Sequence, residues 1–388
     1  MHSVISKKAL TPTLSLAIAI ATESVAIGDG WESESEISTA LGYDSNPFQL
    51  NDGYDNAFFT EIEAEQTFTH TVGKEAAIEL SLDGRGLFYE SDASDSNRWN
   101  INPSLKLISG EYDWSGGELD SDIEVSAVYR DSTFTSRRTG EEAASRGTLV
   151  GDRYDSWTYD AIFGLRYRKD RKWYLYWDNG YRYKNYTEDY AALGLDRLDY
   201  HEFESDFRIR YRATDKFTLS GDLELHHRSY VDRRIKDLSG DRIAGSDLEY
   251  DSIMVGAQIA YEINDLWQIS VGISHDQRSD NGDGYSDKTT EDYYVEIEYE
   301  KGPLEAAFEA EYVDRSFDNG EIDADGIDEP ERSKEAWQFS FDIEYSLDLF
   351  ESAESTLFAQ IENELVDNTS ETLTYDRTVA LVGIVFEF

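Results

Sequence analysis

Charged side chains recur at every second position in several stretches of this chain. Arg208, Arg210 and Arg212 alternate with apolar residues, and Glu296, Glu298 and Glu300 do the same in a later stretch. Spacing of two places all of these charges on one face of an extended strand. Rows of fixed charge facing water attract or repel ions and orient dipolar solutes, so the chemistry they predict is that of a channel wall.

The same spacing defines two larger sets of residues. The predicted basic wall comprises Arg166, Arg168, Arg182, Lys184, Arg208, Arg210, Arg212 and Arg228. The predicted acidic wall comprises Glu61, Glu63, Glu65, Glu296, Glu298, Glu300, Glu305, Glu309, Glu311, Asp342, Glu344, Glu362 and Glu364. Two opposed walls would produce a transverse field, and the acidic excess would favour cations. The alternative is that mixed charges only keep the interior hydrated.

Catalytic chemistry is poorly represented, and we expect no enzyme activity. The six histidines include His226, which shares a face with Glu224 and Arg228, whereas His227 and His275 belong to the opposite, apolar face. No phosphate loop, dinucleotide fingerprint or pair of histidines at metal-ligand spacing is present. An outer-membrane enzyme with His226 at its centre remains the least favoured alternative.

Two acidic segments offer oxygen ligands for Ca²⁺, although the expected cofactor set is none. Their candidate ligands are Asp280, Asp283, Asp287, Asp323, Asp325 and Asp328. Calcium prefers several such oxygens on a tight loop, but neither segment has the complete twelve-residue calcium-loop pattern. Both segments are also consistent with solvated loops, or with loops whose bound cations bridge lipopolysaccharide phosphates.

Composition removes several protein classes. The chain has 388 residues, a formal charge of −46 and no cysteine. Nucleic-acid binding requires a basic surface, and thiol catalysis, disulfide scaffolds and thiolate metal sites require cysteine. Aromatic residues make up 13% of the chain, which argues against an acidic disordered protein.

The first residues predict export. A basic start with Lys7 and Lys8 precedes an apolar run and the small-x-small site Ser24-Val25-Ala26. This pattern is typical of a signal peptide over residues 1–26, followed by one domain over residues 27–388. No later apolar run reaches the ~18 residues that a membrane helix needs.

Period-two alternation continues through the rest of the chain and predicts sixteen strands. They are expected at residues 36–45, 57–70, 75–90, 98–109, 118–131, 155–169, 172–187, 199–213, 216–232, 249–263, 266–279, 291–300, 303–316, 334–347, 355–366 and 374–388. Short turns alternate with long acidic loops, so the strands run up and down. Pro103 predicts a bulge or local break in the fourth strand.

The fold class is therefore all-β, and two architectures compete. A soluble barrel or sandwich would bury its apolar face, whereas a transmembrane barrel turns that face to lipid. Segments of ~10–16 residues match a tilted membrane span. Tryptophans near segment ends, on the apolar face, match an interfacial belt; these are Trp99, Trp157, Trp173, Trp267 and Trp337. We predict an antiparallel transmembrane β-barrel of about sixteen strands, with short periplasmic turns and long acidic extracellular loops.

Two short motifs carry a resemblance. Leu381–Phe388 alternates apolar residues up to Phe386 and Phe388, and it resembles the terminal strand that barrel-assembly machinery recognises in bacterial outer-membrane β-barrels. Leu41–Phe48 resembles the opening of outer-membrane porins, some of them linked to exopolysaccharide export. The resemblance implies a channel or export pore, with Phe386 and Phe388 as its assembly signal, and supplies no pore residues.

Together these observations predict a porin-like channel in the outer membrane of a Gram-negative bacterium. The expected cargo is a hydrophilic solute or a polysaccharide, and the expected surroundings are lipid, lipopolysaccharide and the assembly machinery. The first alternative is a structural barrel whose acidic loops bind matrix polysaccharide or divalent cations. The longest connection, residues 132–155, would either narrow the pore or form an ordinary external loop, and both monomer and trimer fit the sequence.

Overall fold

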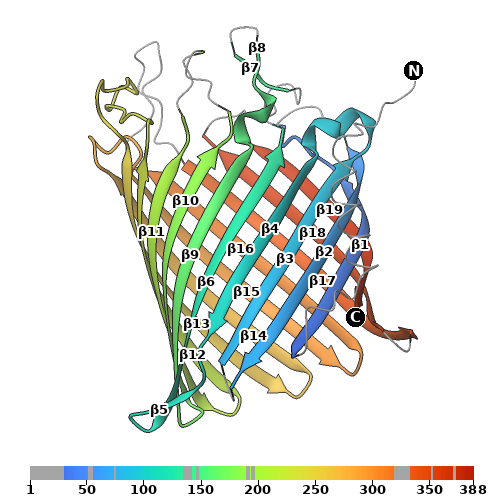
Figure 1. Ribbon diagram of the computed structural model, residues 1–388. Helices are drawn as coiled ribbons and strands as arrows, with labels where there is room; N and C mark the ends of the chain where they lie inside the picture. The colour runs from blue at the N-terminus through green and yellow to red at the C-terminus, as the bar shows by residue number, and fades with distance from the viewer. Residues whose placement is uncertain are drawn as a thin grey trace.

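The computed structural model describes residues 30–50, 56–73, 76–133, 142–145, 148–188, 193, 197–318, 333–350, 353–369 and 373–388. The predicted signal peptide lies outside these ranges. Across the described residues the chain forms one closed antiparallel barrel of sixteen strands in an up-and-down order (Figure 1). No helix in the described part of the chain is long and apolar enough to span a membrane.

Each predicted segment overlaps one barrel strand. The strands are β1 (Trp31–Asp44), β2 (Ala57–Val72), β3 (Ala76–Tyr89), β4 (Arg98–Ile108), β6 (Gly117–Ser132), β9 (Ser156–Lys169), β10 (Trp173–Tyr186), β11 (Tyr200–Thr214), β12 (Phe217–Tyr230), β13 (Glu249–Asn264), β14 (Trp267–Asp280), β15 (Lys288–Lys301), β16 (Leu304–Phe317), β17 (Ser333–Phe350), β18 (Ala353–Asn368) and β19 (Tyr375–Glu387). The predicted strand count is confirmed.

Three short strands were not predicted. β5 (Tyr112–Trp114) extends β4 and pairs with β6 beyond the turn end of the barrel. β7 (Ala144–Ser145) and β8 (Thr148–Leu149) form a small hairpin above the rim, inside the longest connection (Figure 1). Two 3₁₀ segments, η1 (Ser91–Ser96) and η2 (Gly151–Tyr154), lie at the same loop end. The described part of residues 132–155 therefore contributes a hairpin above the rim.

Pro103 interrupts the hydrogen-bond ladder between β4 and β6 without changing its register. Leu82 on β3 faces Pro103, but the β4–β6 pairing stops at Ile101 and resumes at Ser104 in the same register. Proline has no N–H to donate to the β6 side, so the ladder loses its bonds at this point only. The predicted local break is present, and there is no bulge.

The outer face of the barrel is a continuous apolar surface. On β13, Ile253, Val255 and Ile259 are exposed, whereas the intervening positions Met254 and Gln258 are partly covered. Aromatic side chains stack near both ends of the strands. At the loop end, the ring centroids of Tyr312 and Trp337 are 4.7 Å apart. At the turn end, the ring centroids of Trp173 and Tyr211 are 4.3 Å apart. This is the arrangement of a lipid-facing band between two aromatic girdles.

The barrel closes by pairing β1 with β19 in register from Glu36 with Glu387 to Asp44 with Val379. Gly42 is required at this seam because the ring of Phe59 occupies the space that a Cβ would take. Beyond the last strand pair, the N–H of Ser45 donates to the carbonyl of Thr378 at 2.9 Å. Over the described residues each of the sixteen barrel strands is consequently paired on both sides, as a sheet in lipid requires.

The Leu41–Phe48 motif is explained at the loop end of this seam. Asp44 is fully buried and receives a forked ion pair from Arg377, at 3.1 Å to Oδ1 and 2.6 Å to Oδ2. The hydroxyl of Tyr89 also donates to Asp44 Oδ2, at 2.8 Å, and the Asn46 N–H donates to Oδ1. The Asn46 side chain then binds Leu50 and the carbonyl of Asp376. The motif fastens the first loop to the last strand.

Replacing the outward-facing Val255 with arginine should destabilise the barrel in a bilayer or micelle. Val255 is 46% exposed near the middle of β13, where an arginine facing lipid costs about 2–4 kcal/mol. Gln258→Arg, on the inner face of the same strand, is the matched control and should cost much less. The measurement is urea unfolding in lipid vesicles. Equal losses for the two variants would contradict the assignment of the faces.

Replacing Arg377 with methionine should destabilise the barrel strongly, because it leaves Asp44 as a buried charge without its cation. Removal of one partner from a buried pair costs about 3–5 kcal/mol. The control is Lys106→Met, because Lys106 Nζ lies 3.8 Å from Glu124 in a half-exposed pair, and such pairs contribute about 0–1 kcal/mol. Urea unfolding of both variants checks the prediction, which a similar loss in the two would refute.

Candidate channel lumen

All residues of the two predicted walls lie on the face of their strands opposite the exposed apolar side chains. The sheet order places β9 to β12, which carry the basic set, about half-way round the barrel from β16 to β18, which carry much of the acidic set. His226 shares the charged face, whereas His227 lies on the other. The alternation of the strands thus directs both sets inward, while the pore-lining role remains a prediction.

Register brings half of the basic set into ion pairs that sequence reasoning did not identify. Arg182 Nε lies 2.7 Å from Asp160, and Arg228 Nη2 lies 2.7 Å from the buried Glu202. Arg166 pairs with Asp122. Arg168 similarly lies 2.6 Å from Glu111 and 2.8 Å from Glu118. These arginines are locally neutralised, which reduces their part in a transverse field.

The other four residues of the predicted basic wall are less neutralised by neighbouring carboxylates. Within the described part of the chain, no ion pair joins Arg208, Arg210 or Arg212 to a carboxylate, and all three are exposed on the inner face. Lys184 lies over the ring of Tyr186, with Nζ 5.2 Å from its centroid. Within the predicted basic wall, the arginines without a carboxylate partner are therefore those of β11, toward the turn end of the barrel.

The acidic set has few cationic partners. Arg85 holds Glu61 at 2.5 Å and Glu63 at 2.7 Å on neighbouring strands. Tyr375 donates its hydroxyl to Glu364 at 2.8 Å, and Gln268 donates to Glu298. Apart from the Arg85 pairs, these are contacts with neutral groups, so within the described residues few carboxylates of the acidic wall are paired with a cation.

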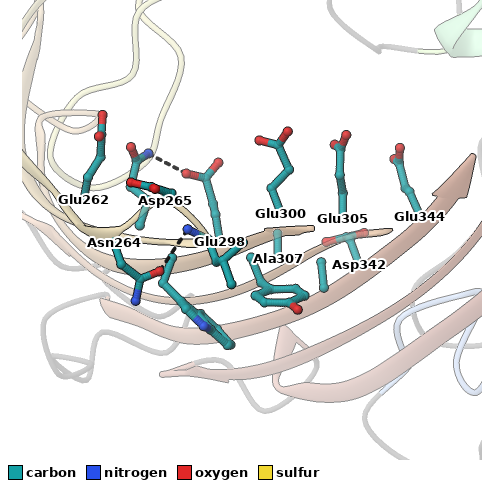
Figure 2. A pocket seen from close by; sticks show the side chains of 14 residues that line it. Glu262, Asn264, Asp265, Glu298, Glu300, Glu305, Ala307, Asp342 and Glu344 are labelled. Carbon is teal, nitrogen blue, oxygen red and sulfur yellow. Dashed lines mark hydrogen bonds between the residues drawn. The ribbon is translucent and has the colours of Figure 1, made fainter. Parts of the chain in front are cut away.

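A negative patch lies at the turn end. A cavity of about 360 Å³ is lined there by seven carboxylates, and their side chains point to the same side of the sheet (Figure 2). They are Glu262, Asp265, Glu298, Glu300, Glu305, Asp342 and Glu344. Glu262 and Asp265 were absent from the sequence-based set, although alternation along β13 could have identified Glu262. Arg212 lies close to the turn that follows β11, so this patch and the arginines of β11 are both near the turn end of the barrel.

Two loops cover the inner wall at the other end. Residues 45–50 place Phe48 and Leu50 against Phe59, Leu87 and Tyr89 of β2 and β3. Half-way round the barrel, loop residues Ile235 and Leu248 pack on inner-face tyrosines of β11, β12 and β13. These tyrosines are Tyr200, Tyr230 and Tyr250. Tyr154, a residue of a third described loop, lies against inner-face Tyr186 of β10, with ring centroids 6.5 Å apart.

Two carboxylates of one predicted Ca²⁺ loop, Asp280 and Asp287, accept hydrogen bonds from the loop's own backbone. Asp280 accepts the N–H groups of Gly282, Gly284 and Ser286 at 2.7–3.1 Å. Asp287 accepts the N–H of Asp280, and burial raises the pKa of the Asp287 carboxyl. Asp323, Asp325 and Asp328 lie outside the described residues. Calcium binding at either loop stays a prediction.

Asp155 is a further loop carboxylate with an altered pKa. It accepts the N–H of Ser132 at 2.9 Å, which ties the end of the longest connection to β6. Burial raises its pKa to about 6, and the neighbouring Asp131 and Asp152 act in the same direction. The carboxyl therefore takes up a proton at a higher pH than an exposed aspartate does.

The strand number, the closed antiparallel order and the apolar outer band decide the fold. It is a porin-like β-barrel. Residues 138–286 match the family described as "Putative MetA-pathway of phenol degradation", which is less than half of the chain. No curated protein matches the chain.

Solved structures with a similar fold include proteins from three organisms. The anion-selective porin from Comamonas acidovorans is 12% identical, with a TM-score of 0.46 and coverage of 92% of this chain and 99% of that one. OccAB1 from Acinetobacter baumannii is 7% identical, with a TM-score of 0.48 and coverage of 93% and 97%. OpdK from Pseudomonas aeruginosa, solved with vanillate, is 12% identical, with a TM-score of 0.45 and coverage of 92% and 99%.

Reversing the free charges of β11 should shift ion selectivity. Arg208→Glu, Arg210→Glu and Arg212→Glu combined should move the reversal potential toward that of K⁺, because they replace three unpaired cations in the lumen with anions. Arg171→Glu with Lys172→Glu, in the exposed β9–β10 turn, is the control and should have a smaller effect. An unchanged reversal potential in the triple variant would show that the β11 row serves only hydration.

Proposed function

We propose that this protein is an outer-membrane channel through which small hydrophilic solutes diffuse. One observation carries the proposal: a closed sixteen-stranded barrel has an apolar outer face and a charged inner face. A barrel of this strand number encloses a water-filled lumen too wide for side chains to fill. The apolar band supports a lipid surrounding, and the signal-peptide pattern supports export to the outer membrane.

The proposed channel prefers cations. Half of the basic set is neutralised by carboxylates on adjacent strands, whereas the acidic patch at the turn end has no lysine or arginine among its lining residues. Cations would therefore concentrate in the lumen relative to anions. The described part of the inner wall offers rows of fixed charge, which support passage without chemical conversion.

The solute is proposed to be small. Two loops pack on the inner wall near the mouth, on different sides of the barrel, and this placement supports a compact solute over a polysaccharide chain. The partial match to a family described by phenol degradation also fits a small organic substrate. Glycan export remains the second possibility for cargo, and an open path that admits long dextrans would favour it.

Planar-bilayer recording of the refolded chain tests the proposal. Stepwise conductance should appear, with a reversal potential on the K⁺ side in a KCl gradient near 0.1 M. The preference should shrink near 1 M, because the screening length falls from about 10 Å to about 3 Å. Insertion is verified separately by a heat-dependent gel shift. Inserted protein that gives no conductance would refute the channel and leave the structural barrel as the better account.

A further inference from the structure

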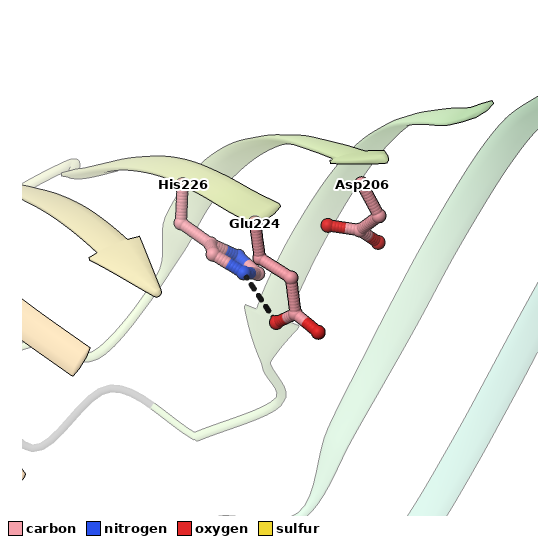
Figure 3. A group of neighbouring side chains, drawn as sticks. All are labelled: Asp206, Glu224 and His226. Carbon is pink, nitrogen blue, oxygen red and sulfur yellow. Dashed lines mark hydrogen bonds and ion pairs between the residues drawn. The ribbon is translucent and has the colours of Figure 1, made fainter. Parts of the chain in front are cut away.

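Three side chains on neighbouring strands converge on the inner wall. Glu224 and His226 lie two residues apart on β12 and so share a face, and Asp206 on β11 is directly opposite Glu224. His226 Nε2 is 3.4 Å from Glu224 Oε2. One ligand atom from each of the three residues lies within 4.8 Å of the other two (Figure 3).

Two of the three side chains in this group are carboxylates, and a third carboxylate lies beside them. Asp206 faces Asp178 on one side and Glu224 on the other, so three carboxylates lie in one cross-strand row. Arg166 reaches Asp178 at 3.5 Å, but within the described residues no lysine or arginine pairs with Asp206 or Glu224. Like charges placed directly opposite one another destabilise a sheet, so a bound cation would reduce the repulsion between these carboxylates.

One oxygen of the group also lacks a partner. Asp206 Oδ1 is buried, and within the described residues it accepts no hydrogen bond. A buried carboxylate oxygen without a donor pays its desolvation cost without compensation. Asp206 differs in this from Asp280, whose oxygens are occupied by backbone N–H groups.

The donor set selects the class of ion. We propose that Asp206, Glu224 and His226 bind a divalent transition-metal ion of the Zn²⁺ type on the inner wall of the barrel. Zn²⁺ accepts one imidazole nitrogen and two carboxylate oxygens and keeps a fourth position for water. Imidazole favours Zn²⁺, Ni²⁺ and Cu²⁺ over Ca²⁺ and Mg²⁺, which prefer oxygen alone.

The geometry requires only side-chain adjustment. Ligand atoms around a tetrahedral Zn²⁺ with bonds of about 2.0–2.1 Å are about 3.3 Å apart. The His226–Glu224 distance already has this value, and Asp206 approaches from the adjacent strand. The strands fix the three Cα positions, so binding does not require the backbone to move.

Calorimetry with ZnCl₂ on the refolded full-length barrel in detergent tests the site without reference to conductance. The wild-type chain should bind Zn²⁺ at one saturable site. His226→Ala and Glu224→Gln should each weaken that binding at least about tenfold, because each removes a ligand. CaCl₂ in tenfold excess should not displace the metal.

His227→Ala is the matched control, because His227 is the adjacent residue and lies 2.8 Å from a single carboxylate, Asp251, on the opposite face. It should leave the Zn²⁺ affinity unchanged. Folding of every variant is checked by the heat-dependent gel shift, and His226→Gln provides a second variant of similar volume. Lack of a saturable site, undiminished binding in His226→Ala and His226→Gln, or equal competition by Ca²⁺ would each overturn the proposal.

Discussion

Every strand of this protein depends on the closure of its sheet. The bilayer offers no water to satisfy backbone N–H and C=O groups, so a strand can remain there only if both of its edges are paired. Fifteen of the sixteen pairings in the ring join strands that follow one another in sequence, but the β1–β19 pairing joins the two ends of the described barrel. Asp44 and Arg377 reinforce that seam with a buried ion pair.

Closure also gives one chain two chemical surfaces. Because side chains alternate along each strand, every second residue contacts the surroundings and the others face the interior. This separation explains how a chain with a formal charge of −46 and a mean hydropathy of −0.60 can carry a continuous apolar band. The same alternation made the strands predictable. The even spacing of Ile253, Val255 and Ile259 can be read from the sequence without knowing which residues they contact.

Contacts between strands could not be predicted in the same way. Alternation assigned Arg166 to the inner face, but its pairing with Asp122 joins residues 44 positions apart and depends on register and on the order of β6 and β9. The cluster at His226 shows the same limit. Glu224 was visible as its neighbour on one strand, whereas Asp206 became its neighbour only through the β11–β12 register. The early start of β1 was missed because polar residues 32–36 carry no apolar alternation.

Most inner-face residues are polar or charged, and several apolar or aromatic exceptions lie where loops pack on the wall. Phe59 and Leu87 face inward on β2 and β3, and Tyr200 and Tyr250 face inward on β11 and β13. In an open lumen the apolar surface of these side chains would be exposed to water. Each pair is instead covered by a loop segment that supplies its own apolar residues. Apolar inner positions near the loop end thus mark where a loop folds onto the wall. The inner face near the turn end carries exposed charges instead. Regular alternation of apolar and polar residues therefore specifies the barrel strands. Apolar residues at inner positions, where the alternation predicts polar ones, mark the places at the entrance where loops pack.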